Sequence, residues 1–285
     1  MMRLAWLALI ALASPAYALD EARLTAAARA EEAALSARLG AAVLDTATGR
    51  VWGYHADERF PMDSTHKAFA CAALLAKVDK GETSLDRRVV FVATDIEPYS
   101  PITQDRIAPN SMSLAEFCEA ALSVSDNTAA NFVLAADGGP AGVTAFFRSL
   151  GDATSRLDRT EPDLNEAAPG DPRDTTTPAA AVADLDKTLL GAVLKPTSRE
   201  RLTNWMIGDR VAGALLRKAL PEDWRIADKT GNGSHGSRGI VAVLWPPNRA
   251  PLVAAIYLTD TAASMKVRDA AIARLGAELV KEIAP

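Results

Sequence analysis

The sequence has little of what a metal-dependent enzyme needs. Its 285 residues include two cysteines, Cys71 and Cys118, and three histidines, His55, His66 and His235. The histidines form no His-x-His cluster, and two cysteines complete no zinc site with them at any familiar spacing. This scarcity argues against a metal-dependent hydrolase, and we expect neither a metal nor an organic cofactor.

Long apolar runs are also missing after residue 18, since none reaches the ~20 residues that a membrane-spanning helix needs. The first 18 residues differ: Arg3 precedes an apolar run over residues 4–13, and the small residues Ala16 and Ala18 follow. A basic start, a short apolar stretch and a small-x-small end are typical of a secretory signal peptide. We predict a signal peptide over residues 1–18, cleavage after Ala18, and a periplasmic or secreted protein with no membrane attachment after cleavage.

No stretch of the chain concentrates positive charge. The 31 Lys and Arg residues stand against 36 Asp and Glu residues, for a net charge of −5. A basic run that would mark a surface for nucleic acid or for an anionic membrane is absent. We therefore expect no nucleic-acid partner.

The apolar pattern predicts strands near both ends of the chain and helices between them. Two strands joined by a turn are expected at 39–45 and 50–54, and three more at 225–229, 239–245 and 252–258. Helical periodicity covers residues 21–37, 65–80, 113–122, 127–136, 140–150, 178–190, 198–207 and 263–283. We predict an α+β fold, with an antiparallel β-sheet built from both termini, flanked by helices, plus an inserted all-helical region.

This pattern divides the chain after the signal peptide into two predicted parts. Residues 19–63 and 207–285 form an α/β domain, and residues 64–206 form a helical domain. Within the helical part, residues 156–177 are rich in Asp, Pro, Thr and Gly and predict a loop longer than an ordinary connection. Loops of that length are usually functional or disordered.

Ser64 and Lys67 lie at the start of an apolar helix, where the i, i+3 spacing places the hydroxyl and the amine on one face. A serine hydroxyl is a weak nucleophile until a base takes its proton, and a helix N-terminus offers N–H groups that stabilise an oxyanion. Ser-x-x-Lys alone is weak, because a capping serine followed by a solvated lysine is common.

Two further tripeptides strengthen the pattern. Ser125-Asp126-Asn127 precedes another apolar helix, and Lys229-Thr230-Gly231 ends a predicted strand. Each is common alone, but the three motifs in this order, on a helix, a helix-entry loop and a strand, are hard to obtain by chance. Together they resemble the penicillin-recognising serine enzymes, which implies a serine β-lactamase/DD-peptidase-like fold.

The segment Glu161-Pro-Asp-Leu-Asn165 in the long loop selects one branch of that superfamily. A carboxylate and an amide four residues apart can hold a water for hydrolysis, and the chain resembles the class A β-lactamases over essentially its whole length after the signal. The resemblance implies a monomer that hydrolyses the β-lactam amide bond of penicillins and some cephalosporins, with β-lactam resistance as the result. Its partners would be these small-molecule substrates.

The resemblance also implies catalytic roles. Ser64 attacks the lactam carbonyl, and Lys67 and Glu161, the latter through a water, are alternative acylation bases. Ser125 relays a proton to the departing nitrogen. Glu161, helped by Asn165, activates the water that deacylates the enzyme.

Binding roles follow in the same way. The substrate carboxylate is expected on Lys229, Thr230 and Arg238, because a guanidinium suits an anion. Asn127 would bind the side-chain amide of the substrate, and Tyr99 would wall the entrance.

Two structural features complete what the resemblance implies. The backbone N–H groups of Ser64 and Asn232 would form an oxyanion hole. Arg159 and Asp174 would form an ion pair that closes the long loop and holds Glu161 near its water; the alternative is two surface charges worth about 1 kcal/mol or less.

The two cysteines are candidates for one disulfide, because export favours oxidation. Cys71 and Cys118 also match a disulfide found in part of the family. Two buried free thiols are the alternative.

Asp63 departs from the family pattern, which usually has a neutral residue before the nucleophile. A carboxylate there could disfavour an oxyanion, so we expect Asp63 to be neutral or bonded to a backbone donor, and to change turnover or inhibitor response. Neither Asp63 nor Gly233 is cysteine, so the disulfide typical of carbapenem-hydrolysing relatives is missing. Gly233 and Arg238 fit penicillins first and carbapenems last. His66 and His235 are expected to pack or to face solvent.

Three rival functions remain at this point. A DD-peptidase shares the Ser-x-x-Lys, Ser-x-Asn and Lys-Thr-Gly motifs but releases penicillin slowly, and Glu161 with Asn165 argues against it. A penicillin-binding sensor normally carries transmembrane segments. A catalytically inactive relative would lack an essential side chain, and only Asp63 points in that direction.

Overall fold

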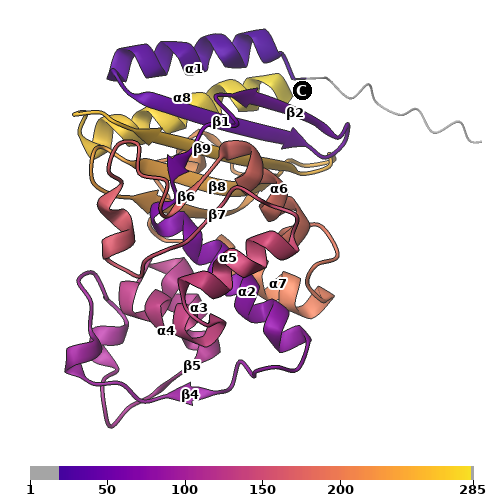
Figure 1. The fold of residues 1–285 in the computed structure, drawn as a ribbon. Helices are drawn as coiled ribbons and strands as arrows, with labels where there is room; N and C mark the ends of the chain where they lie inside the picture. Colours follow the sequence, from indigo (N-terminus) through magenta and orange to yellow (C-terminus); the bar gives the residue numbers. More distant parts are fainter. Residues whose placement is uncertain (1–18, 284–285) are drawn as a thin grey trace, which may run out of the picture.

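The computed structural model describes residues 19–283, so the predicted signal peptide and its cleavage site lie outside the described residues. Its largest sheet has five antiparallel strands in the order β2-β1-β9-β8-β7. These are β1 (Arg38–Asp45), β2 (Arg50–Tyr54), β7 (Arg225–Asn232), β8 (Arg238–Trp245) and β9 (Leu252–Thr259). Because β1 and β2 come from one end of the chain and β7 to β9 from the other, the predicted α+β sheet is confirmed (Figure 1).

Helices cover both faces of this sheet. α1 (Glu21–Leu35) and α8 (Met265–Ile283) pack on one face, and α6 (Pro178–Leu189) contacts β1, β8 and β9 on the other (Figure 1). Alternate residues of β8 enter two cores: Ile240 belongs to the core beneath α1 and α8, and Val241 to the core of the helical part. Two covered faces explain why the sequence of β8 is a continuous apolar run.

The remaining α-helices lie on the α6 side of the sheet (Figure 1). They are α2 (His66–Asp79), α3 (Leu114–Ser123), α4 (Asn127–Asp137), α5 (Pro140–Ser149) and α7 (Pro196–Ile207). α2 contacts each of the other four, and all of residues 68–75 are buried. A helix that is apolar all round needs such an enclosure, which fixes the start of α2 against the sheet. The domain boundaries after residues 63 and 206 stay a prediction.

Short elements connect the long loop to the strand that leads into α2. β3 (Phe60–Pro61) pairs with β6 (Thr175–Thr176), and β4 (Arg88–Val89) pairs with β5 (Met112–Ser113). Single 3₁₀ turns are η1 (Asp63–Thr65), η2 (Ala93–Asp95), η3 (Thr103–Asp105), η4 (Asp163–Glu166) and η5 (Leu216–Ala219). Residues 156–177 therefore contain a 3₁₀ turn and a paired strand, which makes this loop more regular than its composition predicts.

The disulfide predicted between Cys71 and Cys118 is not formed in this structure and stays a prediction. Both cysteines are free and buried, Cys71 on α2 and Cys118 on α3. Burial raises the pKa of the Cys118 thiol well above its ordinary value, and a hydrogen bond with Cys71 raises it further. Two neutral thiols in contact behave as small apolar groups, so they fill the space between α2 and α3 without a covalent bond.

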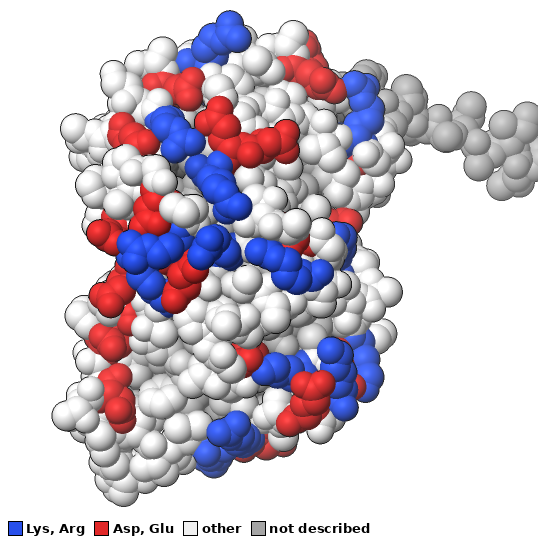
Figure 2. Space-filling model, viewed as in Figure 1, with Lys and Arg blue, Asp and Glu red and all other residues white. Residues whose placement is uncertain are grey.

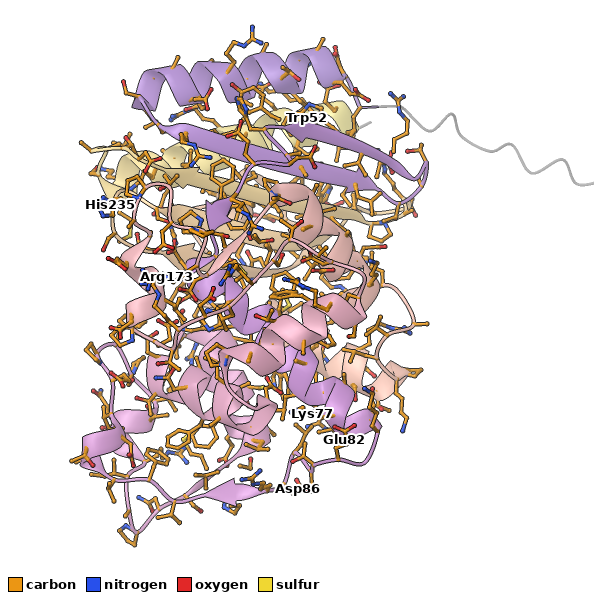
Figure 3. The ribbon with its side chains drawn as sticks, viewed as in Figure 1. Trp52, Lys77, Glu82, Asp86, Arg173 and His235 are labelled. Atoms are coloured by element: carbon orange, nitrogen blue, oxygen red, sulfur yellow. The ribbon has the colours of Figure 1, made fainter. Side chains whose placement is uncertain are left out.

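The surface mixes charges of both signs. Figure 2 shows Lys and Arg interspersed with Asp and Glu over the displayed face. Arg173 in the long loop (Figure 3) is one case, with Nη2 at 2.6 Å from Asp171 and 3.6 Å from Glu166. None of the helices within residues 19–283 combines the length and the apolar character needed to cross a membrane.

Candidate active site

Ser64 and Lys67 meet the carboxylate of Glu161 at the start of α2. Ser64 Oγ donates a 3.3 Å hydrogen bond to Glu161 Oε1, and Lys67 Nζ lies 3.0 Å from the same oxygen. Lys67 and Glu161 are almost completely buried, and Ser64 is 9% exposed. The structure thus places the Glu161 carboxylate within reach of both the Ser64 hydroxyl and the Lys67 ammonium.

Burial shapes the proton affinity of Lys67. It lowers the pKa of the amine, and the negative charge of Glu161 opposes that shift without cancelling it. Nζ also donates to Asn127 Oδ1 at 2.7 Å, to the Ser125 carbonyl at 2.8 Å and to Ser125 Oγ at 3.3 Å. A buried amine with a lowered pKa gives up a proton more easily than a solvated one, which is what a general base requires.

Glu161 keeps its charge although it is buried. Burial raises the pKa of its carboxyl, but Lys67, His66 and Asn165 together outweigh burial and hold the pKa below the ordinary value. Asn165 Nδ2 donates a short hydrogen bond to Glu161 Oε2. An ionised carboxylate that shares its second oxygen with an amide can orient and deprotonate a water.

Asn131 on α4 fixes the backbone of Glu161, and sequence reasoning missed it. Its Oδ1 accepts from Glu161 N and its Nδ2 donates to Glu161 O, both at 2.9 Å. The available signal was a polar residue one turn after Asn127 in an otherwise apolar helix. This pair of bonds anchors the long loop to the helical part at the residue that matters most.

Ser125 lies between two ammonium groups. Ser125 Oγ accepts hydrogen bonds from Lys229 Nζ at 3.1 Å and from Lys67 Nζ at 3.3 Å. Burial lowers the pKa of Lys229 to about 8, and the positive charges of Lys67 and Arg238 add to that shift. Since Ser125 Oγ accepts from both lysines, its own hydrogen is free to donate to a substrate atom.

These groups line one cavity of about 420 Å³. Eight of its lining residues are predicted site residues: Ser64, Tyr99, Ser125, Asn127, Asn165, Thr230, Asn232 and Arg238. Val211 and Met265 complete the lining, and Met265, at the start of α8, is an exposed apolar residue that sequence reasoning missed because it reads as ordinary helix. Glu161, Lys67 and Lys229 lie behind this wall, within hydrogen-bonding distance of its serines.

Arg238 is held in place by two neighbours. Its Nε donates to Asp269 Oδ1 on α8 at 2.7 Å, and its Nη1 donates to the Gly231 carbonyl on β7 at 2.9 Å. Among the described residues Nη2 has no hydrogen-bond partner, so this nitrogen remains for a substrate anion. Asp269 has no signal in the sequence, because it lies on a different element from every motif.

The long loop is closed by a buried ion pair. Arg159 Nε lies 2.6 Å from Asp174 Oδ2, and Asp174 Oδ1 accepts from the N–H groups of Asp158 and Arg159 at 2.7 and 2.9 Å. Asp174 is 1% exposed, so the alternative of two surface charges does not describe this pair. Arg159 also pairs with Glu166, a contact that the sequence did not predict.

Asp63 and His66 are buried beside the nucleophile. Asp63 accepts a short hydrogen bond from the Ser237 hydroxyl rather than from a backbone donor, and burial raises its pKa to about 7. His66 Nδ1 contacts the Asp63 carbonyl at 2.8 Å, and burial lowers its pKa to about 4, so the neutral ring packs. His235 lies in the exposed turn between β7 and β8 (Figure 3).

No group of three or more His, Cys, Asp or Glu side chains within residues 19–283 is arranged to hold a metal ion. The chemistry that the site offers is therefore built from a buried serine, two lysines with lowered pKa values and an ionised carboxylate. That set fits acyl transfer to a serine followed by hydrolysis.

Comparisons with known proteins agree with this geometry. The model of the β-lactamase enzyme family matches residues 22–283. The chain is 54% identical over 272 residues to the β-lactamase AER-1 of Aeromonas hydrophila, a match that covers 95% of this chain and 90% of that protein.

Solved structures give the same result. The class A β-lactamase of the last common ancestor of Gram-negative bacteria has a TM-score of 0.89 and 53% identity, with 90% of this chain and 98% of that chain covered. The putative class A β-lactamase PenP from Rhodopseudomonas palustris has a TM-score of 0.89 and 47% identity, with 90% and 98% covered. The chain belongs to the β-lactamase enzyme family. Within it, the enzyme is a class A serine β-lactamase, as the sequence predicted.

Proposed function

We propose that the enzyme hydrolyses the β-lactam amide bond of penicillins and some cephalosporins through an acyl-enzyme on Ser64, and so confers β-lactam resistance. Water activated by Glu161 then releases the acyl group. The observation that carries the proposal is the shared carboxylate: Glu161 Oε1 lies 3.3 Å from Ser64 Oγ and 3.0 Å from Lys67 Nζ. A carboxylate in that place serves a second, hydrolytic step.

Acylation begins when Ser64 Oγ attacks the lactam carbonyl carbon. Its proton passes to Lys67 or, through a water, to Glu161, whose Oε1 lies 3.3 Å from Ser64 Oγ and 3.0 Å from Lys67 Nζ. The N–H groups of Ser64 and Asn232 bind the developing oxyanion. The Ser125 hydroxyl, in contact with Lys67 and Lys229, then donates its proton to the ring nitrogen as the C–N bond breaks, and takes a replacement proton from Lys67.

Deacylation is the hydrolysis of the ester on Ser64. Glu161 removes a proton from a water that Asn165 helps to orient, and the hydroxide attacks the ester carbonyl. The proton returns to Ser64 Oγ as the ester bond breaks. Positioning of Glu161 depends on the loop, which the Arg159–Asp174 pair and Asn131 hold closed.

Substrate selection is proposed to depend on the residues that contact the substrate carboxylate and the side-chain amide. Thr230, Lys229 and Nη2 of Arg238 receive the substrate carboxylate, since Arg238 is already oriented by Asp269. Asn127 binds the side-chain amide, and Tyr99 walls the entrance with 60% of its surface exposed. Gly233 and Arg238 fit a penicillin-preferring pocket, so penicillins are expected to be hydrolysed best and carbapenems least.

The setting of the enzyme is also part of the proposal. A cleaved signal would deliver it as a monomer to the periplasm or the medium, without membrane attachment, where β-lactams are its small-molecule partners. Nucleic acid is not expected to bind, because the sequence has no basic run and charges of both signs are interspersed on the face shown in Figure 2.

The test is the fate of the acyl-enzyme. Purified enzyme is mixed with benzylpenicillin, and ring opening by absorbance and protein mass are followed together. Many turnovers per enzyme support the proposal, whereas one equivalent of ring opening with a lasting adduct on Ser64 supports the alternative, a DD-peptidase or a penicillin-binding sensor. A Ser64→Ala variant, which should open no rings, is the matched control.

A further inference from the structure

Asp63 lies directly before the nucleophile and against the strand edge that carries Asn232. Its carboxyl is fully buried, and Oδ2 bonds to the Ser237 hydroxyl just before β8. Oδ1 is buried without a hydrogen-bond partner among the described residues. A Cβ built on Gly233 would lie 2.3 Å from Asp63 Oδ1, so the carboxyl occupies the space that a side chain at position 233 would need.

The other glycine beside Asn232 packs on the same residue. A Cβ on Gly231 would lie 2.7 Å from the Met62 carbonyl oxygen, 2.9 Å from Asp63 Cβ and 3.2 Å from Ser64 N. The two chain neighbours of Asn232, Gly231 and Gly233, therefore both lie close to Asp63. Asp63 is in turn the chain neighbour of Ser64. The two proposed oxyanion donors are the N–H groups of Ser64 and Asn232. The distance between them therefore depends on how Asp63 packs against both segments.

We propose that Asp63 is a positioning residue of the oxyanion hole, which aligns the two donors while its carboxyl is protonated and weakens them when the carboxyl ionises. The inference rests on the proposed function, because it concerns the oxyanion of that reaction. A protonated carboxyl donates to Ser237 and leaves an uncharged carbonyl against Gly233. An ionised carboxyl places negative charge behind the Ser64 N–H, where it opposes a second negative charge on the substrate oxygen.

The groups around Asp63 act in opposite directions. Burial is the largest influence and raises the pKa of Asp63 to about 7, and the charge of Glu161 raises it further. The Ser237 hydroxyl and the positive charges of Arg238 on β8 and Arg268 on α8 lower it. The remaining titratable groups that face Asp63 are neutral near pH 7: His66 on α2 and Tyr257 on β9.

An asparagine is the matched substitution for the protonated form. Asp63 has a φ of 45°, in the left-handed region that Asp and Asn tolerate better than most residues. The amide of Asp63→Asn can donate to Ser237 from Nδ2 and place its carbonyl against Gly233, with no charge at any pH. Ser237→Ala is the complementary variant, because it removes the hydroxyl that lowers the pKa of Asp63.

The experiment compares pH profiles of kcat/KM for benzylpenicillin in the three proteins. Losing an oxyanion donor outright costs about a hundredfold to a thousandfold, so weakened donors are expected to cost roughly tenfold. The wild type should lose about that factor as pH rises through 7, before a later loss near the pKa of Lys229, about 8. Asp63→Asn should lack the first decrease, and Ser237→Ala should move it to higher pH.

An infrared difference spectrum between the wild type and Asp63→Asn measures protonation without turnover. A protonated-carboxyl band from Asp63 is expected at pH 6 and should be gone at pH 9. An unchanged first decrease in Asp63→Asn, or no such band at pH 6, overturns the proposal. If circular dichroism shows that Asp63→Asn does not fold, a decrease in Ser237→Ala that stays in place or moves to lower pH overturns it instead. No ring opening at any pH would refute the proposed function itself.

Discussion

Glu161, in the long loop, and Asp63, against strand β7, are equally hidden from solvent, at 1% and 0% exposed. Glu161 has the ammonium of Lys67 at 3.0 Å, and its pKa is lowered in spite of burial. Asp63 has a hydroxyl as its only hydrogen-bonding partner among the described residues, and burial raises its pKa to about 7. The comparison shows that the contacting partner, rather than burial, decides which of two hidden carboxyls is charged.

The largest expected effect comes from removing the negative charge of Glu161 in the long loop. Glu161→Gln should lower kcat for benzylpenicillin by about 10²–10⁴-fold, the usual contribution of a general base. Protein mass should show a lasting adduct on Ser64 if deacylation is the step that fails.

Glu166→Gln is the control for that result. It removes a carboxylate from the same loop, but this one is half exposed and pairs with Arg159. We expect kcat to change by about twofold or less, as for a surface ion pair. A similar loss in both variants would mean that loop stability, not the charge at Glu161, supports turnover.

Breaking the buried Arg159–Asp174 ion pair should destabilise the long loop, residues 156–177, and leave the surroundings of Asp63 unchanged. Asp174→Asn leaves Arg159 without its partner, and we expect the free energy of unfolding to fall by about 2–3 kcal/mol, below the 3–5 kcal/mol of a fully buried pair because Arg159 is partly exposed. Urea unfolding measures this change. Deacylation should slow, while the decrease in kcat/KM near pH 7 assigned to Asp63 should stay in place.

The stability that Asp63 contributes from its place against β7 should instead depend on pH. Because the folded pKa of Asp63 is about 7, the folded state holds a proton that the unfolded state releases above the ordinary aspartate pKa of 3.8. Stability from this group is therefore lost as pH rises from about 4 to about 7. Asp63→Asn should unfold at the same urea concentration as the wild type at pH 4 and be more stable at pH 8, by up to about 4 kcal/mol. An equal difference at both pH values would contradict the assigned protonation.

The smallest effect is expected at Asp269. Asp269→Asn keeps a hydrogen-bond acceptor for Arg238 but removes the negative charge that competes with a substrate carboxylate. We expect KM for benzylpenicillin to fall by about fivefold, or about 1 kcal/mol, with little change in kcat. Steady-state kinetics at two salt concentrations would check it, and a rise in KM would show that the charge mainly orients Arg238.

Local patterns predicted much of this molecule. The strands at both ends and the helices between them follow from apolar periodicity, and the residues of the three motifs line or adjoin one cavity. β7 extends to Asn232, beyond the predicted end at Lys229, because Gly231 and Asn232 pair with Gly239 and Arg238 of β8. A glycine-containing segment gives no strand signal of its own.

Other features depend on contacts between distant segments. Three polar residues each reach a site residue from another element: Asn131, Ser237 and Asp269. Only Asn131 has a local signal, as a polar residue in an otherwise apolar helix. The disulfide stays a prediction, because the presence of two cysteines in an exported chain cannot show whether their thiols are bonded. The sequence raised the question whether Asp63 is charged, but the answer depends on the residues that surround its carboxyl.

The most direct test of the account is the pH dependence of the deacylation rate constant, measured in single turnovers of the preformed benzylpenicillin acyl-enzyme. If ionised Glu161 is the base, the rate should stay level on the acid side until pH falls below the ordinary carboxyl value of 4.5, because Lys67 and Asn165 lower the pKa of Glu161. Glu161→Gln should be slow and without that acid decrease. A rate that already falls between pH 7 and pH 5, or that Glu161→Gln leaves unchanged, would contradict the assignment of Glu161 as the hydrolytic base.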